Sequence, residues 1–169
     1  MTAARRRLLL LRHAKALAAA PGAPDDWDHP RPLADRGISE AASMGRLLRE
    51  RRLQPQRALV STATRARQTF TRLGLQPPAG ETVVVYSDRL YLADPASLLD
   101  ALRETPTEAD SMLLVGHNPG LHELAFRLSG EAAALRGGFV TCMLALFDID
   151  GAWTDLQARH ARLSDLLVP

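Results

Sequence analysis

The chain has 169 residues, a length that fits one domain with a sizeable buried core. Hydrophobic residues make up 46% and charged residues 24%, which excludes a largely disordered chain, and the single Cys142 excludes an intramolecular disulfide framework and a multi-cysteine zinc site. The formal charge is only +2, yet the pI is near 9.2 and Lys15 is the sole lysine among 21 basic residues.

The N-terminal segment places Arg5–Arg7 before the apolar run Leu8–Leu11, as a secretory signal would. Arg12 and His13 interrupt the run after four leucines, whereas the apolar region of a signal peptide needs about 7–15 residues. No apolar stretch approaches the roughly 18 residues of a membrane span. We therefore expect a cytoplasmic protein with a buried strand over Arg7–Leu11.

The first half of the chain then alternates helix and strand patterns. A loop rich in Pro, Gly and Asp extends over about 21–37. Ser39 is the predicted N-cap of a helix over about 39–53, because apolar residues follow on one face. Ala58–Val60 predicts a second strand, and a helix over about 63–73 should end before Gly74.

The second half continues the alternation. The predicted strands are, in order, Thr82–Tyr86, Ser111–Val115 and Phe139–Ile149. Asp94-Pro95 and Asn118-Pro119 each predict a helix start, with the first residue as N-cap and the proline as first helical residue. Gly151 predicts a turn toward an edge partner near Trp153.

These repeated strand–helix units predict an α/β fold of three layers, α/β/α, in which helices cover both faces of a mostly parallel sheet. Neither an internal repeat nor a linker that could divide two domains is present, so we expect residues 1–169 to form a single domain.

Basic residues follow several of the predicted strands. Arg12 and His13 end the first strand, Arg65 follows the second, and His117 follows the fourth. Taken singly, each has an ordinary structural explanation, such as a surface charge or a hydrogen-bonded loop histidine. In open α/β sheets, however, ligands bind beyond the carboxyl ends of the strands, so we expect these four side chains to converge.

Two guanidinium groups beside two imidazoles suit an anion with several oxygens, and phosphate is the obvious one. A neutral imidazole nitrogen can serve as the nucleophile and form a covalent phosphohistidine. The sequence has no Walker A loop, no G-x-G-x-x-G, no H-E-x-x-H and no cluster of carboxylates. We therefore predict phosphoryl transfer without a metal or a cofactor.

Four motifs resemble those of the histidine phosphatase superfamily, the phosphoglycerate-mutase-like clan. They are Leu11-Arg12-His13-Ala14, the run Ser61–Thr69 (S-x-x-x-R-A-x-Q-T), the G-H-N-P segment Gly116–Pro119, and Arg31-Pro32-Leu33 with Gly37 following. The last resembles the short branch that contains the SixA-type phosphohistidine phosphatases. The resemblance covers about residues 8–128 and implies the phosphoglycerate-mutase-like fold and a bacterial, cytoplasmic hydrolase.

The resemblance also implies roles for individual residues. His13 would take the phosphoryl group, Arg12 and Arg65 would bind its oxygens, and His117 would donate a hydrogen bond to it. Arg31 and Asn118 would contact the substrate at the mouth of the pocket. Arg67, two residues after Arg65, is expected on the surface.

The general acid of larger members, a carboxylate after the third strand, has no clear counterpart. Asp88 and Asp94 are the candidates, although Asp94 is already the predicted helix cap. A phosphohistidine substrate releases imidazole and needs less help from an acid than an alkoxide does. The short chain also leaves little room for a substrate lid, which favours a phosphohistidine borne by a protein.

Several alternatives stay open. A small-molecule phosphomonoesterase of the same superfamily is the second hypothesis, a mutase is disfavoured by size, and a non-catalytic phosphate-binding domain would not need to keep His13. Because 19 acidic residues accompany 21 basic ones and aromatic residues are few, a nucleic-acid partner is not expected. The sequence specifies neither the physiological substrate nor the oligomeric state.

Overall fold

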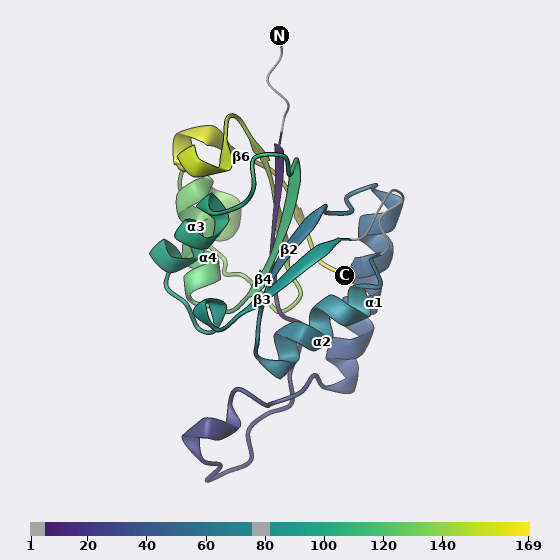
Figure 1. The fold of residues 1–169 in the computed structure, drawn as a ribbon. Helices are drawn as coiled ribbons and strands as arrows, with labels where there is room; N and C mark the ends of the chain where they lie inside the picture. The colour runs from purple at the N-terminus through teal and green to yellow at the C-terminus, as the bar shows by residue number, and fades with distance from the viewer. Residues whose placement is uncertain (1–5, 76–81) are drawn as a thin grey trace.

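A computed structural model describes residues 6–75 and 82–169. Its centre is a six-stranded sheet with the strand order β3-β2-β4-β1-β5-β6 (Figure 1). The strands are β1 (Arg6–Arg12), β2 (Arg57–Ser61), β3 (Val83–Ser87), β4 (Ser111–Gly116), β5 (Leu144–Ile149) and β6 (Ala161–Leu167). The first four run parallel, and β5 pairs antiparallel with both β1 and β6. The predicted α/β fold with a mostly parallel sheet is confirmed.

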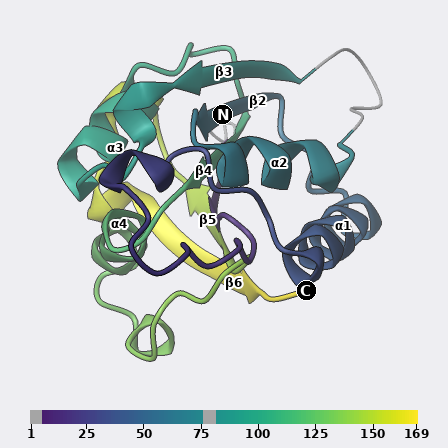
Figure 2. The ribbon, with the colours of Figure 1, turned by 90° about the horizontal axis from the view of Figure 1, so that it is seen from below.

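Helices cover both faces of the sheet, as Figure 2 shows from below. The α-helices are α1 (Asp35–Glu50), α2 (Thr64–Leu73), α3 (Pro95–Arg103) and α4 (Gly120–Leu128). Short 3-10 helices connect them: η1 (Asp25–Trp27), η2 (Asp88–Leu90), η3 (Ala133–Leu135), η4 (Trp153–Asp155) and η5 (Ala158–His160). The three predicted layers are therefore present.

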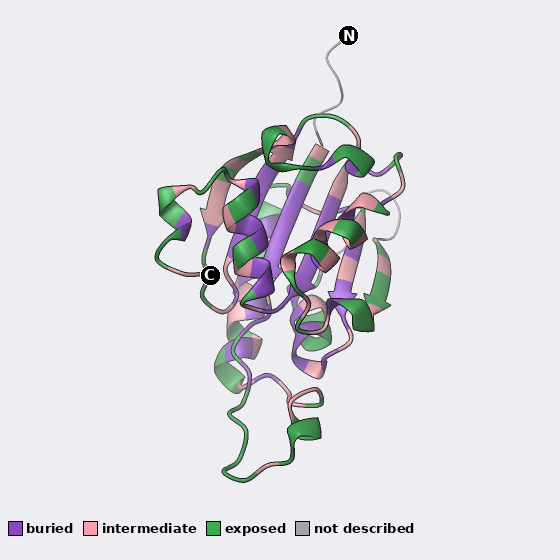
Figure 3. Cartoon of the chain, turned by 90° about the vertical axis from the view of Figure 1, so that its left-hand side faces the viewer, coloured by how far each residue is buried: buried purple, intermediate pink, exposed green. Residues whose placement is uncertain are grey.

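The leucine run of β1 supplies both cores, because successive side chains of a strand point to opposite faces. Leu8 and Leu10 pack with the apolar faces of α3 and α4, while Leu9 and Leu11 pack with those of α1 and α2. All four leucines are almost fully buried, and Figure 3 shows the same burial along the central strands. This rigid central strand ends directly at Arg12 and His13.

The first helix begins earlier than predicted. It starts at Asp35, so Ser39 is not its cap, and the Ser39 hydroxyl instead donates to the Asp35 carbonyl at 3.2 Å. The first turn of α1 is tightly packed, because a Cβ on Gly37 would lie 2.0 Å from the Lys15 carbonyl oxygen. Glycine at this position lets α1 press against the segment that follows His13.

The expected start of α4 is also wrong in detail. The helix begins at Gly120 with Pro119 as N-cap, and Asn118 provides no capping hydrogen bond. The Asn118 amide instead donates to the distant Phe139 carbonyl at 2.8 Å, so a tertiary contact replaces the local cap. The peptide bond between Asn118 and Pro119 is cis.

The C-terminal strands differ from the prediction as well. Strand β5 begins only at Leu144, because Cys142 adopts a φ of 59° and interrupts the extended backbone. The edge partner is β6, not the segment near Trp153, which is a buried 3-10 turn whose indole donates to the Ala109 carbonyl at 2.7 Å.

Two other local predictions are confirmed. Asp94 caps α3 by accepting from the backbone nitrogen of Ser97 at 2.9 Å, and α2 ends at Gly74 in the left-handed conformation. Within the described residues, none of the helices combines the length and the apolar character needed to cross a bilayer.

Candidate active site

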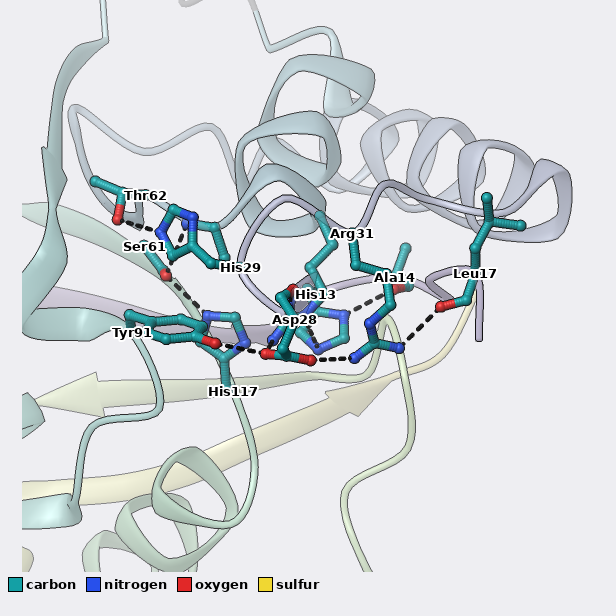
Figure 4. Close-up of polar contacts among 12 residues, drawn as sticks. His13, Ala14, Leu17, Asp28, His29, Arg31, Ser61, Thr62, Tyr91 and His117 are labelled. Atoms are coloured by element: carbon teal, nitrogen blue, oxygen red, sulfur yellow. Dashed lines mark hydrogen bonds and ion pairs between the residues drawn. The ribbon is translucent and has the colours of Figure 1, made fainter. Parts of the chain in front are cut away.

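A pocket of about 300 Å³ opens at the carboxyl ends of β1 and β4, beside the N-terminus of α2. Its lining includes all six residues proposed from the sequence as catalytic or substrate-binding. The lining residues are Arg12, His13, Lys15, Ala16, Asp28, Arg31, Arg65, Leu92, His117, Asn118 and Thr141. The predicted convergence at one sheet edge is thus present in the geometry, and Figure 4 shows the polar contacts that organise it.

The His13 ring is held by its own backbone region. Its Nδ1 lies 2.8 Å from the Ala14 carbonyl oxygen, which can only accept, so Nδ1 carries the proton and donates. Nε2 therefore carries the lone pair, and this lone pair accepts from Arg65 Nε at 3.3 Å. Burial, together with the positive charges of Arg65, Arg12 and Arg31, lowers the pKa of His13 to about 4. At neutral pH the ring is therefore uncharged, and an uncharged imidazole nitrogen can act as a nucleophile.

His117 faces His13 across the pocket, with ring centroids 5.1 Å apart. Its Nε2 lies 2.8 Å from the Ser61 hydroxyl, and that hydroxyl accepts from the Ala63 backbone nitrogen at 3.3 Å. The Ser61 hydroxyl can donate its proton to His117 Nε2, and in that arrangement the His117 proton is on Nδ1. His117 Nδ1 is buried and has no hydrogen-bond partner among the described residues.

The pKa of His117 is lowered to about 3, mainly because the ring is buried. Nearby His13 and Arg65 lower this pKa further. A neutral imidazole with an unpaired N–H is a hydrogen-bond donor that awaits an acceptor. In Figure 4 this side of the ring faces Asp28 and His13. An anion bound between the two histidines would satisfy the orphaned Nδ1.

Arg12 and Asn118 share one anchor. The Arg12 Nη1 and the Asn118 amide nitrogen both donate to the Phe139 carbonyl, each at 2.8 Å. The Arg12 Nε and the Asn118 Oδ1 are buried without partners in the described part of the chain. The loop before β5 therefore positions both side chains while leaving polar atoms unused.

Sequence analysis missed Asp28, which organises the arginines. Its carboxylate accepts from Arg65 Nη2 at 2.9 Å, from Arg31 Nη2 at 2.8 Å and from the Tyr91 hydroxyl at 2.6 Å. Burial alone would raise the pKa of Asp28, but these three hydrogen bonds hold it well below its ordinary value. Asp28 is a permanent anion that directs two guanidinium groups.

The only sequence signal for Asp28 was its position in the loop shortly before Arg31. The residues around it form no pattern that indicates a functional carboxylate. Tyr91 was missed for the same reason. Its ring stands perpendicular to that of His117, with centroids 5.5 Å apart, and burial together with Asp28 raises its pKa. The hydroxyl therefore stays protonated and serves as a donor to Asp28.

Neither candidate for the general acid lines the pocket. Asp94 is engaged with Ser97 at the start of α3, where the hydrogen bonds lower its pKa. Asp88 accepts a hydrogen bond from the Thr62 hydroxyl. Among the described lining residues, Asp28 alone carries a carboxyl group, and it is ionised. A carboxylic acid that could protonate a leaving group is thus absent from the described lining.

No group of three or more His, Cys, Asp and Glu side chains within residues 6–75 and 82–169 is arranged to hold a metal ion. The pocket offers guanidinium groups, one ammonium group and two neutral imidazoles. This donor set suits an oxyanion with several oxygens rather than a cation.

No family model matches the chain, but several known proteins are similar to it over most of its length. An uncharacterized protein of Mycobacterium leprae is 34% identical over 166 residues, which cover 94% of this chain and 99% of that protein. A solved structure of an inferred phosphohistidine phosphatase SixA from Nakamurella multipartitia is 29% identical, with a TM-score of 0.86 over 100% of this chain and 99% of that one.

A second solved structure, of an inferred phosphohistidine phosphatase SixA from Agrobacterium tumefaciens, is 34% identical. It covers 97% of this chain and 98% of its own, with a TM-score of 0.80. Sequence identity of 34% over nearly the whole of both chains indicates common family membership and not only a similar fold. The chain therefore belongs to the histidine phosphatase superfamily, in its short SixA-type branch.

Proposed function

We propose that this protein is a phosphatase that forms a covalent phosphohistidine on His13 without a metal ion, and that its substrate is phosphohistidine in a protein. The observation that carries the proposal is the neutral His13 Nε2. It lies 3.3 Å from Arg65 Nε, in a pocket where the buried His117 Nδ1 has no hydrogen-bond partner among the described residues. A nucleophile and the donors for three phosphoryl oxygens are thus close together.

In the first step His13 Nε2 attacks phosphorus while the bond from phosphorus to the substrate imidazole breaks. The substrate ring leaves as neutral imidazole when its other nitrogen carries a proton. Arg12, Arg65 and His117 stabilise the phosphoryl oxygens during the transfer. His13 Nδ1 keeps its proton and continues to donate it to the Ala14 carbonyl, so the phosphorylated ring is cationic.

In the second step water attacks the phosphorus of phosphorylated His13. The bond to Nε2 breaks, inorganic phosphate is released, and the proton of the water passes to phosphate or solvent. Because Nδ1 remains protonated, His13 also leaves as a neutral imidazole. Neither step requires a carboxylic acid, which agrees with the ionised state of Asp28.

The leaving group supports the choice of substrate class. A phosphomonoester releases an alkoxide, which needs protonation by a general acid, and neither Asp88 nor Asp94 lines the pocket. A phosphoramidate such as phosphohistidine avoids that requirement. A phosphorylated protein is therefore the proposed partner, and a cytoplasmic location stays a prediction.

The test compares wild type with His13→Ala on a phosphohistidine-bearing protein and on a chromogenic phosphate monoester, both with a chelator present. We expect wild type to prefer phosphohistidine and His13→Ala to lose turnover of both substrates. Turnover that survives in His13→Ala contradicts the nucleophile, and turnover that disappears with chelator contradicts the metal-free reaction. Preference for the monoester favours a small-molecule phosphomonoesterase instead.

A further inference from the structure

Four exposed apolar side chains belong to segments that line the candidate active site. Leu92 lines the pocket itself, while Leu17, Trp27 and Val140 are each adjacent in sequence to a lining residue, namely Ala16, Asp28 and Thr141. They are 45–54% exposed. We name Leu17, Trp27, Leu92 and Val140 the apolar rim. It accounts for half of the eight exposed large hydrophobic side chains among the described residues.

The apolar rim comes from four separate segments. Leu17 follows β1, Trp27 ends η1, Leu92 follows η2, and Val140 precedes β5. In Figure 1 the loop that carries η1 projects below the sheet, and Figure 4 places Leu17 at the outer end of the Arg31 contact. A shared helix face therefore cannot explain why each of these four pocket-lining segments carries an exposed apolar side chain.

Leu92 is the most unusual member. It is 54% exposed and its φ is 48°, in the left-handed region that a bulky side chain rarely adopts. Such a conformation costs free energy, and a leucine that stays largely in solvent recovers little of it by burial. Observed strain of this kind at a pocket is grounds for assigning a function to the side chain.

Charge indicates which partner fits. The lining carries four cations, Arg12, Lys15, Arg31 and Arg65, against the single carboxylate of Asp28. A partner must therefore present an anionic group to the centre and apolar groups to the surroundings. A free phosphorylated metabolite in the pocket could contact Leu92 but not the rim members beyond the lining, whereas a protein segment can place both kinds of group there.

We propose that the apolar rim binds the apolar residues that flank a phosphorylated side chain in a protein substrate, and that Leu92 and Val140 are specificity determinants. The proposal rests on the proposed function, because it takes the bound anion to be a phosphoryl group on a protein. Protein–protein interfaces commonly have an apolar centre and a polar rim. In this site the centre is polar and the surroundings are apolar, because the centre must bind the anion.

The experiment uses two phosphohistidine peptides of equal length and charge, one with Leu and Phe beside the phosphohistidine and one with Ser and Gly. The rim variants are Leu92→Asn, Val140→Thr and their combination. Val83→Thr is the matched control for Val140→Thr, since Val83 is 47% exposed and Val140 49%, but Val83 lies at the amino end of edge strand β3. Glu131→Asn is the control for Leu92→Asn, because exposed Glu131 also has a positive φ, of 64°.

We expect wild type to prefer the apolar peptide by about 10-fold in kcat/KM, and the double rim variant to lose most of that preference. The two controls should keep the preference. Asparagine tolerates the left-handed region, so Leu92→Asn should unfold at the same or a higher temperature than wild type. Loss of preference then cannot be attributed to unfolding.

Equal kcat/KM for the two peptides in wild type, or a preference that survives in the double rim variant, would overturn the proposal. Failure of the proposed function is visible separately, as absence of turnover of both peptides. In that case fluorescence anisotropy, which measures binding of each peptide to His13→Ala, still tests whether the rim prefers the apolar peptide. Preferential binding of the apolar peptide supports it, and equal or absent binding contradicts it.

Discussion

Asp28 holds Arg65 from two directions. The Arg65 Nη1 donates to the backbone oxygen of Asp28 at 2.6 Å, and Nη2 donates to its carboxylate at 2.9 Å. Arg65 is 2% exposed, so this pairing fixes a nearly buried guanidinium group and leaves Nε directed at His13. The loop that carries Asp28 therefore positions the arginine that donates a hydrogen bond to the proposed nucleophile.

Asp28→Ala should lower kcat/KM by about 10-fold to 100-fold, because charge-assisted hydrogen bonds that orient Arg65 and Arg31 are lost. Steady-state kinetics with a phosphohistidine peptide measures the change. Asp28→Asn keeps an acceptor oxygen and should recover part of the activity. Asp26→Ala, an exposed neighbour in η1, is the control and should behave as wild type. Equal losses in both alanine variants would show that the loop, not the carboxylate, is responsible.

Arg65→Ala should cost about 2.7–4 kcal/mol of barrier, a fall of roughly 10²–10³ in kcat, as removal of a preorganised charge-stabilising donor does. Arg67 provides the matched control two residues later on α2. It is exposed, as expected from the sequence, and its guanidinium carbon lies 4.6 Å from the centre of the Tyr86 ring. Arg67→Ala should leave kcat unchanged. Comparable kcat values for the two variants would remove Arg65 from the proposed mechanism.

Much of the site could be predicted because its residues follow directly from strands. Arg12 and His13 end a leucine run whose burial dictates a central strand, and His117 follows another. Parallel strands bring their carboxyl ends to one edge, so sequence order alone places these side chains together.

Asp28 and Tyr91 could not be predicted in this way. Both lie where the chain has no regular periodicity, and the path of a loop is set by tertiary contacts rather than by local pattern. Asn118 illustrates the same limit. Its sequence context favours a helix cap, but the Phe139 carbonyl, 21 residues away, takes its amide proton instead.

Ser61→Ala should lower kcat by about 10-fold, because Ser61 sets which nitrogen of His117 is protonated. Nitrogen-15 NMR should find the His117 proton on Nδ1 in wild type and a mixture of tautomers in Ser61→Ala. Thr71→Ala, which removes an exposed hydroxyl bonded to the Arg67 carbonyl on α2, is the control. A wild-type His117 protonated on Nε2 would contradict the assignment, since Nδ1 could then not donate to phosphate.

Stability should rise with pH between about 4 and 6.5. The pKa of His13 is lowered from 6.5 to about 4 in the folded protein, so within this window the unfolded chain binds more protons than the native one. The contribution is complete above 6.5 and is lost as the pH falls toward 4, with His13 supplying about 3 kcal/mol. His117 acts in the same direction over a window that extends to about 3.

Urea denaturation at a series of pH values measures this dependence, and His13→Gln should reduce its slope between pH 4 and 6.5, leaving the part that His117 contributes. Asp28 adds little to the slope in this window. Its pKa is lowered from 3.8, so its effect on stability falls mainly below that pH. An NMR titration provides an independent check on the same ring. A His13 midpoint near 6.5 would mean that the imidazole is partly charged at neutral pH, and the pH-independent nucleophile proposed here would then be wrong.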